Sequence, residues 1–249
     1  GNVLANDTDA DGDPISLTGV SNAVGGTVTY DAATGTVTFT RATGYTGPTS
    51  FDYTVNDGST TTVTVEVLDN TAPRATDVQA VNGADNAAGR MDTGDRIVFT
   101  FSEAIDPASI MAGWDGATPA NVVVRVYDTT VLGFPTDDGY DNLMIYDAAD
   151  ENPLPLGRVS LNRADFVSGG NGEYITFGAT GTPSTMTIVD NTLTVTLGSY
   201  ATDNPFVNRT FALGSTAMTW TPSAELTDLA GNRLVPDPVT ESGPNDRDF

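Results

Sequence analysis

Apolar and polar residues alternate in short runs rich in Val, Ile and Thr along most of the chain, and this period of two is typical of β-strands. Near the N-terminus it predicts strands over residues 15–20, 27–30, 36–41, 50–56 and 61–68. Farther along it predicts strands over 76–81, 96–101, 122–127, 143–146, 158–161, 174–177, 186–189, 193–197 and 218–221. Helix is expected only for a turn or two, over 106–111 and 223–226. The pattern therefore predicts an all-β protein.

Several side chains within these strands are large and aromatic. Phe51, Tyr53 and Trp220 occupy alternating strand positions, so we expect them in the core. Trp114 lies in a Gly-rich turn, where its ring could equally be core or stack on a sugar. The turn residues Asn56-Asp57-Gly58 and Asp190-Asn191 predict tight hairpins.

One segment near the N-terminus is densely acidic. Asn6-Asp7-Thr8-Asp9-Ala10-Asp11-Gly12-Asp13-Pro14 alternates four carboxylates with small residues and contains no base. A hard cation that takes six to eight oxygen ligands, such as Ca²⁺, would convert the repulsion among these carboxylates into binding. The alternative is a solvated acidic turn. The segment is not an EF-hand, because Thr18 stands where an EF-hand loop starting at Asp7 needs a bidentate Glu.

The composition narrows the classes of function. Lys+Arg is 10 and Asp+Glu is 33, a net charge of -23, which disfavours nucleic acid and anionic membranes as partners. The chain contains no Cys and no His, which removes disulfides, the common zinc sites and a Ser-His-Asp triad. No apolar run is long enough to predict a membrane-spanning helix. Because the sequence starts with Gly1, we expect it to be a segment of a longer protein.

Residues 1–69 are predicted to form the first domain. Asn2 to Asp13, Gly26 to Tyr30, Gly44 to Gly47 and Phe51 to Gly58 resemble the bacterial cadherin-like repeats of large RTX adhesins. The resemblance covers residues 1–68 and implies a calcium-binding β-sandwich used as a spacer. The strand that precedes the Asn-Asp-x-Asp motif in that family is absent here, so we expect an open sheet edge. Either the sequence is truncated before this strand, or a neighbouring chain supplies the missing strand through a segment such as residues 239–249.

Residues 70–249 are predicted to form the second domain. Asn70 to Pro73, Phe101 to Asp106 and Thr227 to Asn232 resemble bacterial Ig-like modules of surface proteins. An Ig sandwich needs roughly 100 residues. Residues 70–249 exceed this length, so we expect an insertion between residues 128 and 172. The insertion would be either extra strands that cover a sheet edge or a dedicated ligand site. The fold class expected is two tandem Ig/cadherin-like β-sandwiches, the second enlarged by an insertion.

The strand order of two Ig-like sandwiches would gather the acidic loops at one junction. The predicted Ca²⁺ ligands are Asp7, Asp9, Asp11, Asp13, Asp69, Asn70, Glu103, Asp106 and Asp228. Calcium bound there would make the connection between the two domains rigid.

These observations favour a non-enzymatic, calcium-stabilised, extracellular or cell-surface segment of a bacterial adhesin, whose partners are neighbouring modules of the same chain. One alternative is a module that binds a surface glycan or protein through the insertion. Another is a filament subunit that self-associates through the open sheet edge. A glycoside hydrolase would need a carboxylate pair in a cleft, and no local motif indicates one.

Overall fold

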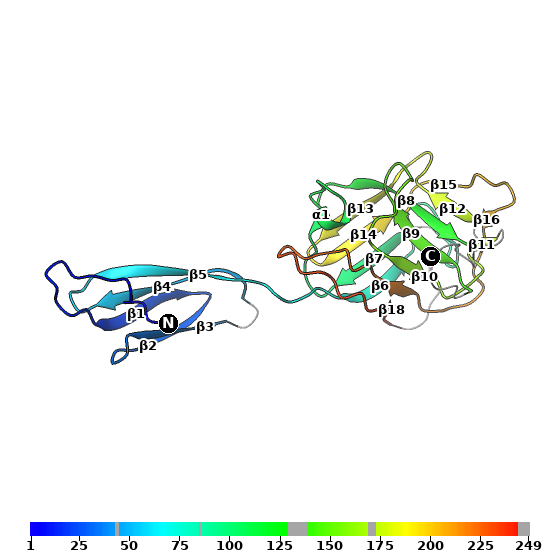
Figure 1. Cartoon of the computed structure of the whole chain (residues 1–249). Coiled ribbons are helices and arrows are strands. Elements are labelled where there is room, and N and C mark those ends of the chain that lie inside the picture. Colours follow the sequence, from blue (N-terminus) through cyan, green and yellow to red (C-terminus); the bar gives the residue numbers. More distant parts are fainter. Residues whose placement is uncertain (43–44, 85, 129–138, 169–172, 244–249) are drawn as a thin grey trace. The chain divides into compact units, whose positions relative to one another are not determined.

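The computed structural model describes residues 1–42, 45–84, 86–128, 139–168 and 173–243 (Figure 1). The chain divides into two compact units, Gly1–Asn70 and Thr71–Phe249. About 45% of the residues are in strands and 2% in helix. The predicted all-β fold class is therefore confirmed.

The first unit contains two small antiparallel sheets. One has the order β1 (Leu17–Val24), β4 (Gly47–Val55), β5 (Thr60–Val67), and the other pairs β2 (Gly26–Asp31) with β3 (Thr36–Arg41). These strands overlap the five expected from the alternation of Val and Thr.

The core of the first unit is small. Its buried apolar cluster consists of Leu17, Val37, Phe51 and Tyr53, which come from both sheets. Phe51 and Tyr53 are therefore core residues, as predicted.

The N-terminal residues lie against β3. The Gly1 amino group donates to the Val37 carbonyl at 2.8 Å, and the Val37 N–H donates to the Gly1 carbonyl at 2.8 Å. Asn2 forms an antiparallel bridge with Thr36. One end of the β3 edge is thus covered by a very short piece of the chain.

The second unit is built on one large curved sheet. Its strand order is β18 (Val239–Thr240), β17 (Thr219–Thr221), β10 (Arg158–Ser160), β9 (Asn142–Tyr146), β8 (Ala120–Tyr127), β13 (Ser184–Val189), β14 (Thr192–Thr196), β7 (Arg96–Phe101) and β6 (Ala75–Val81). β12 (Tyr174–Phe177) pairs with β8 and with β15 (Tyr200–Ala201), and β11 (Val167–Ser168) pairs with β16 (Asn208–Arg209).

Strand β8 joins the two halves of this sheet. Its first residues, Ala120–Val122, pair with β13, and its later residues pair with β9 on one side and with β12 on the other. Both faces of β8 are buried, since Val122 and Val124 belong to the main core while Val123 and Tyr127 belong to a second cluster with Met144.

The predicted insertion is not an appended decoration. β9 and β10 lie inside the sheet, between β8 and β17, and their residues Leu143, Ile145 and Val159 are buried in the main core. The expectation of extra strands that cover an edge is therefore wrong for this part of the segment. Residues 129–138 and 169–172, which also belong to it, lie outside the described residues.

Helix is limited to α1 (Pro107–Ile110) among the described residues. Asp106 caps its start by accepting from the Ala108 N–H, and Pro107 is at its first turn. The second expected helix, over residues 223–226, is wrong. Ser223 and Glu225 form a short turn, and Leu226 instead accepts a hydrogen bond from the Leu234 N–H.

Trp220 is at the centre of the core of the second unit. It is 0% exposed, its ring meets those of Phe99 and Phe101 edge-on at 4.8 and 5.3 Å, and its indole N–H donates to the Leu156 carbonyl at 2.7 Å. The expectation of a core position is confirmed. The hydrogen bond connects the strand that carries Trp220 to the segment before β10.

We predict that Trp220→Ala destabilises the protein by about 3–5 kcal/mol, because it leaves a large cavity and an unpaired carbonyl. Chemical denaturation followed by far-UV circular dichroism measures the change. Phe206→Ala is the control, since Phe206 is 85% exposed, and it should change stability by less than about 0.5 kcal/mol. Equal losses for the two variants would contradict the packing role.

Candidate functional site

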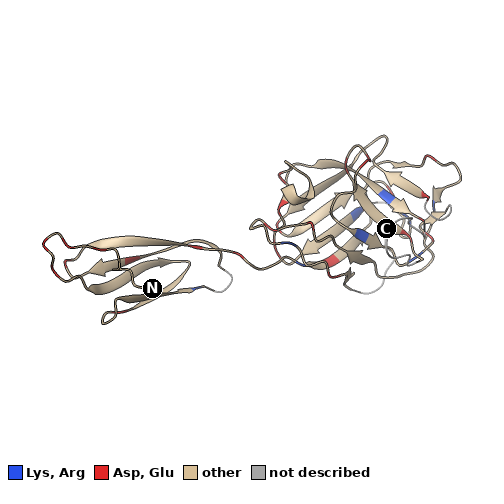
Figure 2. Cartoon of the chain, viewed as in Figure 1, with Lys and Arg blue, Asp and Glu red and all other residues tan. Residues whose placement is uncertain are grey.

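In the acidic segment of the first unit, two backbone N–H groups donate hydrogen bonds to one carboxylate. Asp9 Oδ1 accepts hydrogen bonds from the N–H groups of Asp11 at 2.8 Å and Asp13 at 3.1 Å. These hydrogen bonds, that from Asp13 first, lower the pKa of Asp9. Asp11 and Asp13 are themselves exposed. Figure 2 shows the concentration of acidic residues along this loop.

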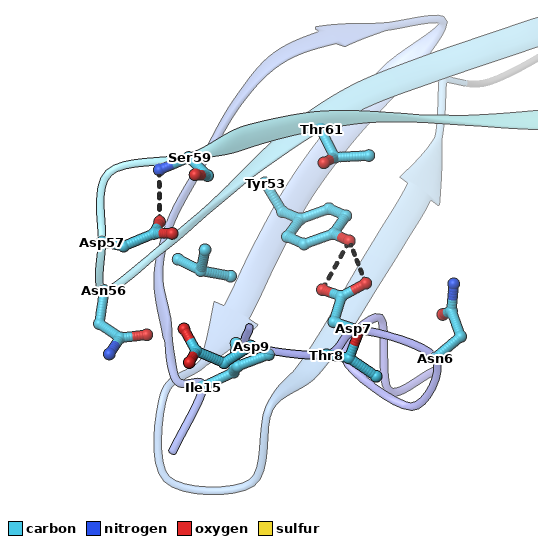
Figure 3. A pocket seen from close by; sticks show the side chains of 11 residues that line it. Asn6, Asp7, Thr8, Asp9, Ile15, Tyr53, Asn56, Asp57, Ser59 and Thr61 are labelled. Carbon is cyan, nitrogen blue, oxygen red and sulfur yellow. Dashed lines mark hydrogen bonds between the residues drawn. The ribbon is translucent and has the colours of Figure 1, made fainter. Parts of the chain in front are cut away.

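Asp7 is held by a buried phenol. The Tyr53 hydroxyl lies 2.8 Å from Asp7 Oδ2 and 3.0 Å from Oδ1 (Figure 3). Burial raises the pKa of Tyr53, and the hydrogen bond and negative charge of Asp7 raise it further. Asp7 and Asp9 both line a pocket of about 310 Å³ whose other side includes Asn56 and Asp57.

The acidic segment is anchored at the turn between β4 and β5. The Ser16 N–H donates to Asn56 Oδ1 at 3.0 Å, and Asn56 Nδ2 donates to the Pro14 carbonyl at 3.1 Å. β1 runs antiparallel to β4 with Leu17 opposite Val55, so residues before Leu17 must emerge where β4 ends.

The position of the acidic segment corrects the expectation that all the acidic loops meet at one junction. β5 starts at the same turn and leads away from it through eight residues, roughly 23 Å, before the connector begins. Asp7, Asp9, Asp11 and Asp13 therefore lie at the opposite end of β5 from Asp69. The predicted gathering of all the acidic loops at one place is wrong, because it assumed that this loop lies where the last strand leaves.

Two acidic residues of the second unit are brought together by backbone pairing. Glu103 follows β7, and two residues later Ile105 forms an antiparallel bridge with Asp228. The Asp106 N–H donates to the Thr227 carbonyl at 2.8 Å. The end of β7 thus lies against the loop that starts at Asp228.

The Asp228 carboxylate is fixed by its own loop. Its Oδ1 accepts from the N–H groups of Ala230 and Asn232, each at 2.8 Å, and its Oδ2 accepts from Asn232 Nδ2 at 2.8 Å. Asp228 is only 3% exposed. These hydrogen bonds orient the carboxylate before any ligand arrives.

A second acidic side chain lies close to this carboxylate. Glu103 and Asp228 each offer one carboxylate oxygen, and these two oxygens lie within 4.8 Å of each other. Asp69, another predicted ligand, belongs to the first unit. Calcium–oxygen distances are about 2.3–2.6 Å, so two oxygens on opposite sides of one ion are about 5 Å apart. The spacing and the oxygen donors both fit a Ca²⁺ ion.

The remaining predicted ligands are placed differently. Asp106 uses its Oδ1 to accept from the Ala108 N–H at 3.0 Å and thereby caps α1. Asn70 is exposed in the connector. Sequence reasoning grouped Asp106 with Glu103 because both follow β7, but the α1 cap uses the Asp106 side chain locally.

The two tryptophans considered for sugar stacking are both buried. Trp114 is 8% exposed and its indole N–H donates to the Thr118 carbonyl at 2.7 Å, while Trp220 is 0% exposed. Neither ring has an open face for a sugar. The two tryptophans therefore give no support to a glycan site.

Sequence reasoning missed a polar cluster on the second face of β8. The Arg125 guanidinium lies 4.1 Å from the ring centre of Tyr146 and 4.6 Å from that of Tyr174, and its Nε donates to Asp150 Oδ1 at 2.8 Å. The only signal in the sequence is an Arg at a strand position between valines. The contacts with the two tyrosine rings and the ion pair with Asp150 account for this arginine as a structural residue.

Residues 1–68 match a family model described as a bacterial Ig domain. No curated protein and no solved structure matches the chain. The match supports a bacterial Ig-like domain in the first unit, while the finer identification as a cadherin-like RTX repeat stays a prediction. Within the described residues, no helix has the length and apolar character needed to cross a membrane.

We predict that stability falls as the pH rises above about 10, partly through Tyr53. Its pKa is higher in the folded state, so protonated Tyr53 favours folding below the unfolded-state pKa and this contribution is lost at higher pH. NMR titration of the Tyr53 ring carbon should show ionisation above the ordinary tyrosine range. Asp7→Asn should lower that pKa partway, because burial remains. A Tyr53 pKa that Asp7→Asn leaves unchanged would contradict the coupling.

Proposed function

We propose that this chain is a non-enzymatic, extracellular segment of a bacterial surface or secreted protein, and that bound calcium makes it a rigid spacer. Bacterial Ig domains occur in surface proteins, and residues 1–68 match that family. The observation that carries the proposal is the close approach of the Glu103 and Asp228 carboxylates. We propose that these two residues bind calcium together with Asp69.

The charges of this group favour a divalent cation. Two unit charges 4.8 Å apart repel by about 3.5 kcal/mol at an effective dielectric constant of 20. A divalent ion placed between the Glu103 and Asp228 oxygens replaces this repulsion with attraction. Calcium is the ion expected, because it accepts several carboxylate oxygens in a flexible shell, whereas Mg²⁺ demands a strict octahedron.

The fold supplies part of the site in advance. The Ala230 and Asn232 N–H groups fix the Asp228 carboxylate, and the bridge between Ile105 and Asp228 holds the end of β7 beside it. We propose that Asp69, in the connector before β6, supplies a further carboxylate, so that bound calcium would restrain the connector. That restraint is the physical basis of the proposed spacer function.

The acidic segment of the first unit is a candidate for a second calcium ion. Asp7 and Asp9 face one pocket, and Asp11 and Asp13 are exposed nearby. The hydrogen bond from Tyr53 already holds Asp7, and no third acidic side chain of the described residues joins Asp7 and Asp9 in a close group. We therefore assign the structural role to the group at Asp228 and expect weaker binding here.

We predict that Ca²⁺ at a hundred times its Kd raises the stability of the folded chain by about 2.7 kcal/mol per site, and that a chelator reverses the gain. Differential scanning calorimetry measures the stability and isothermal titration measures the affinity. Glu103→Gln and Asp69→Asn should each weaken binding on the order of tenfold, since each removes one charged ligand.

Asp106→Asn is the matched control. It removes one charge close to the site, and Asn still caps α1, so calcium affinity should stay within about twofold. Equal weakening by Asp106→Asn and Glu103→Gln would show a diffuse charge effect and no site. An unchanged melting transition with and without calcium would contradict the structural role.

Solution scattering tests the proposed spacer function separately from calcium affinity. Chelation should broaden the distribution of particle lengths measured by solution scattering, because the connector loses its restraint. Asp69→Asn in calcium should reproduce the chelated profile, and Asp106→Asn should not. Identical profiles for the wild type with calcium and with chelator would contradict a spacer stiffened by calcium.

A further inference from the structure

The two outermost strands of the large sheet meet each other. The strand order starts at β18 and ends at β6, yet both β18 and β17 contact β6, and β18 lies beside β6 in Figure 1. The curved sheet therefore closes along one line, where residues 73–79 face residues 235–242. We call this line the seam, and it joins the first strand of the second unit to its last.

The two segments of the seam run parallel. Arg74 forms a parallel bridge with Val235, and the Val235 N–H donates to the Pro73 carbonyl at 2.9 Å. Farther along both segments, the Ser242 N–H donates to Asp77 Oδ1 at 2.8 Å. The contacts thus advance in the same direction along both segments.

Side chains supply hydrogen bonds that the backbone of the seam cannot. Pro236 and Pro238 have no N–H, so their segment cannot form a continuous ladder with β6. The Ser242 hydroxyl donates to Asp77 Oδ2 at 2.9 Å, and Gln79 Nε2 donates to the Ser242 carbonyl at 2.9 Å. Because Asp77 accepts two hydrogen bonds from one residue of the last segment, its carboxylate is the main anchor of the seam.

Apolar packing supports the seam from inside. Val78 on β6 and Leu234 before the last segment are buried in the main core, and Ala75, Ala80 and Val239 pack against the same core. Sliding one segment past the other would expose these side chains to water. Opening the seam therefore costs hydrophobic burial in addition to hydrogen bonds.

We propose that the seam is a mechanical clamp through which the second unit resists being stretched along the chain. Tension enters β6 at its first residue and leaves the last segment after Ser242. Because the segments are parallel, these points lie at opposite ends of the seam, and tension pulls the segments past each other. This function deepens the proposed spacer function and rests on it only in that a spacer carries tension.

The direction of the pull decides how many bonds break in one step. A shearing pull stretches the hydrogen bonds of the seam together, whereas a pull on the same end of both segments peels them apart one after another. Each bond to a charged group that breaks in the same step slows unfolding on the order of tenfold. The parallel arrangement thus gives the greatest resistance to tension along the chain.

The test measures how fast the full chain unfolds under constant load in optical tweezers. The chain contains no Cys, so introduced cysteines are unique attachment points. Thr71→Cys combined with a cysteine added after Phe249 shears the seam. Thr71→Cys combined with Arg233→Cys peels it, because Arg233 is exposed near the end of the seam at Val235. At equal load, the shearing pair should unfold at least about tenfold more slowly than the peeling pair.

Asp77→Ala tests the seam itself, and Asp115→Ala is the matched control. The Asp115 carboxylate likewise accepts from the N–H and the hydroxyl of one residue, Thr118, at 2.7 and 2.8 Å, but within a local turn. Both variants therefore remove the same charge and the same kinds of hydrogen bond. In the shearing pair, Asp77→Ala should speed unfolding about tenfold or more, and Asp115→Ala by no more than about twofold.

The two attachment pairs also separate the clamp from general stability. An overall loss of stability in Asp77→Ala would act in both pairs, whereas loss of the clamp should act mainly in the shearing pair. An effect of the same size in both pairs would overturn the proposal. So would equal unfolding rates of the wild type through the two pairs, or equal effects of Asp77→Ala and Asp115→Ala.

Repeating the measurement with calcium and with chelator separates the clamp from the proposed calcium site. The slower unfolding of the shearing pair should persist in chelator, because no hydrogen bond of the seam involves the proposed ligands. Resistance that disappears on chelation would belong to bound calcium and would overturn the clamp. An unchanged melting transition with calcium, by contrast, would contradict the calcium role and leave the clamp standing.

Discussion

Antiparallel pairing decides where the carboxylates of this chain can meet. Because Leu17 is opposite Val55, the acidic segment before β1 must lie at the turn after β4. Because Ile105 is opposite Asp228, the end of β7 must lie beside the loop that presents the Asp228 carboxylate. Strand register therefore divides acidic residues that are similar in the sequence into two groups with different surroundings.

Individual carboxylates of the chain are stabilised in different ways. Asp9 and Asp228 each accept two backbone N–H groups from their own loops, so local turns compensate part of their charge. In the second unit several other acids pair with arginines, as Asp150 does with Arg125. Asp7 is bonded to a neutral phenol, Tyr53, which satisfies its oxygens without removing its charge. A cation would therefore change the charge balance most where carboxylates face one another.

Local patterns predicted the strands well and the site only in part. Residues 36–41, 96–101 and 174–177 form strands as expected, because these short runs are rich in Val, Ile, Phe and Thr. β11, β15 and β16 were missed, since two-residue strands leave no periodic signal. Asp69, Glu103 and Asp228 were predicted from the sequence as calcium ligands. The position of the Asp7–Asp13 loop depends on long-range strand pairing, and it was predicted wrongly because the assumed strand order of the first unit was incorrect. The contact between Tyr53 and Asp7 spans 46 residues, and no local pattern reports it.

The small core of the first unit makes each of its apolar side chains important to stability. Its buried cluster has four residues, and several of its other apolar side chains, Val63 and Phe39 among them, are only partly buried. Fully burying one valine contributes roughly 1.5–3 kcal/mol, a large share of the stability that so small a core can supply. Each apolar side chain that is buried in this unit therefore contributes a large part of its stability.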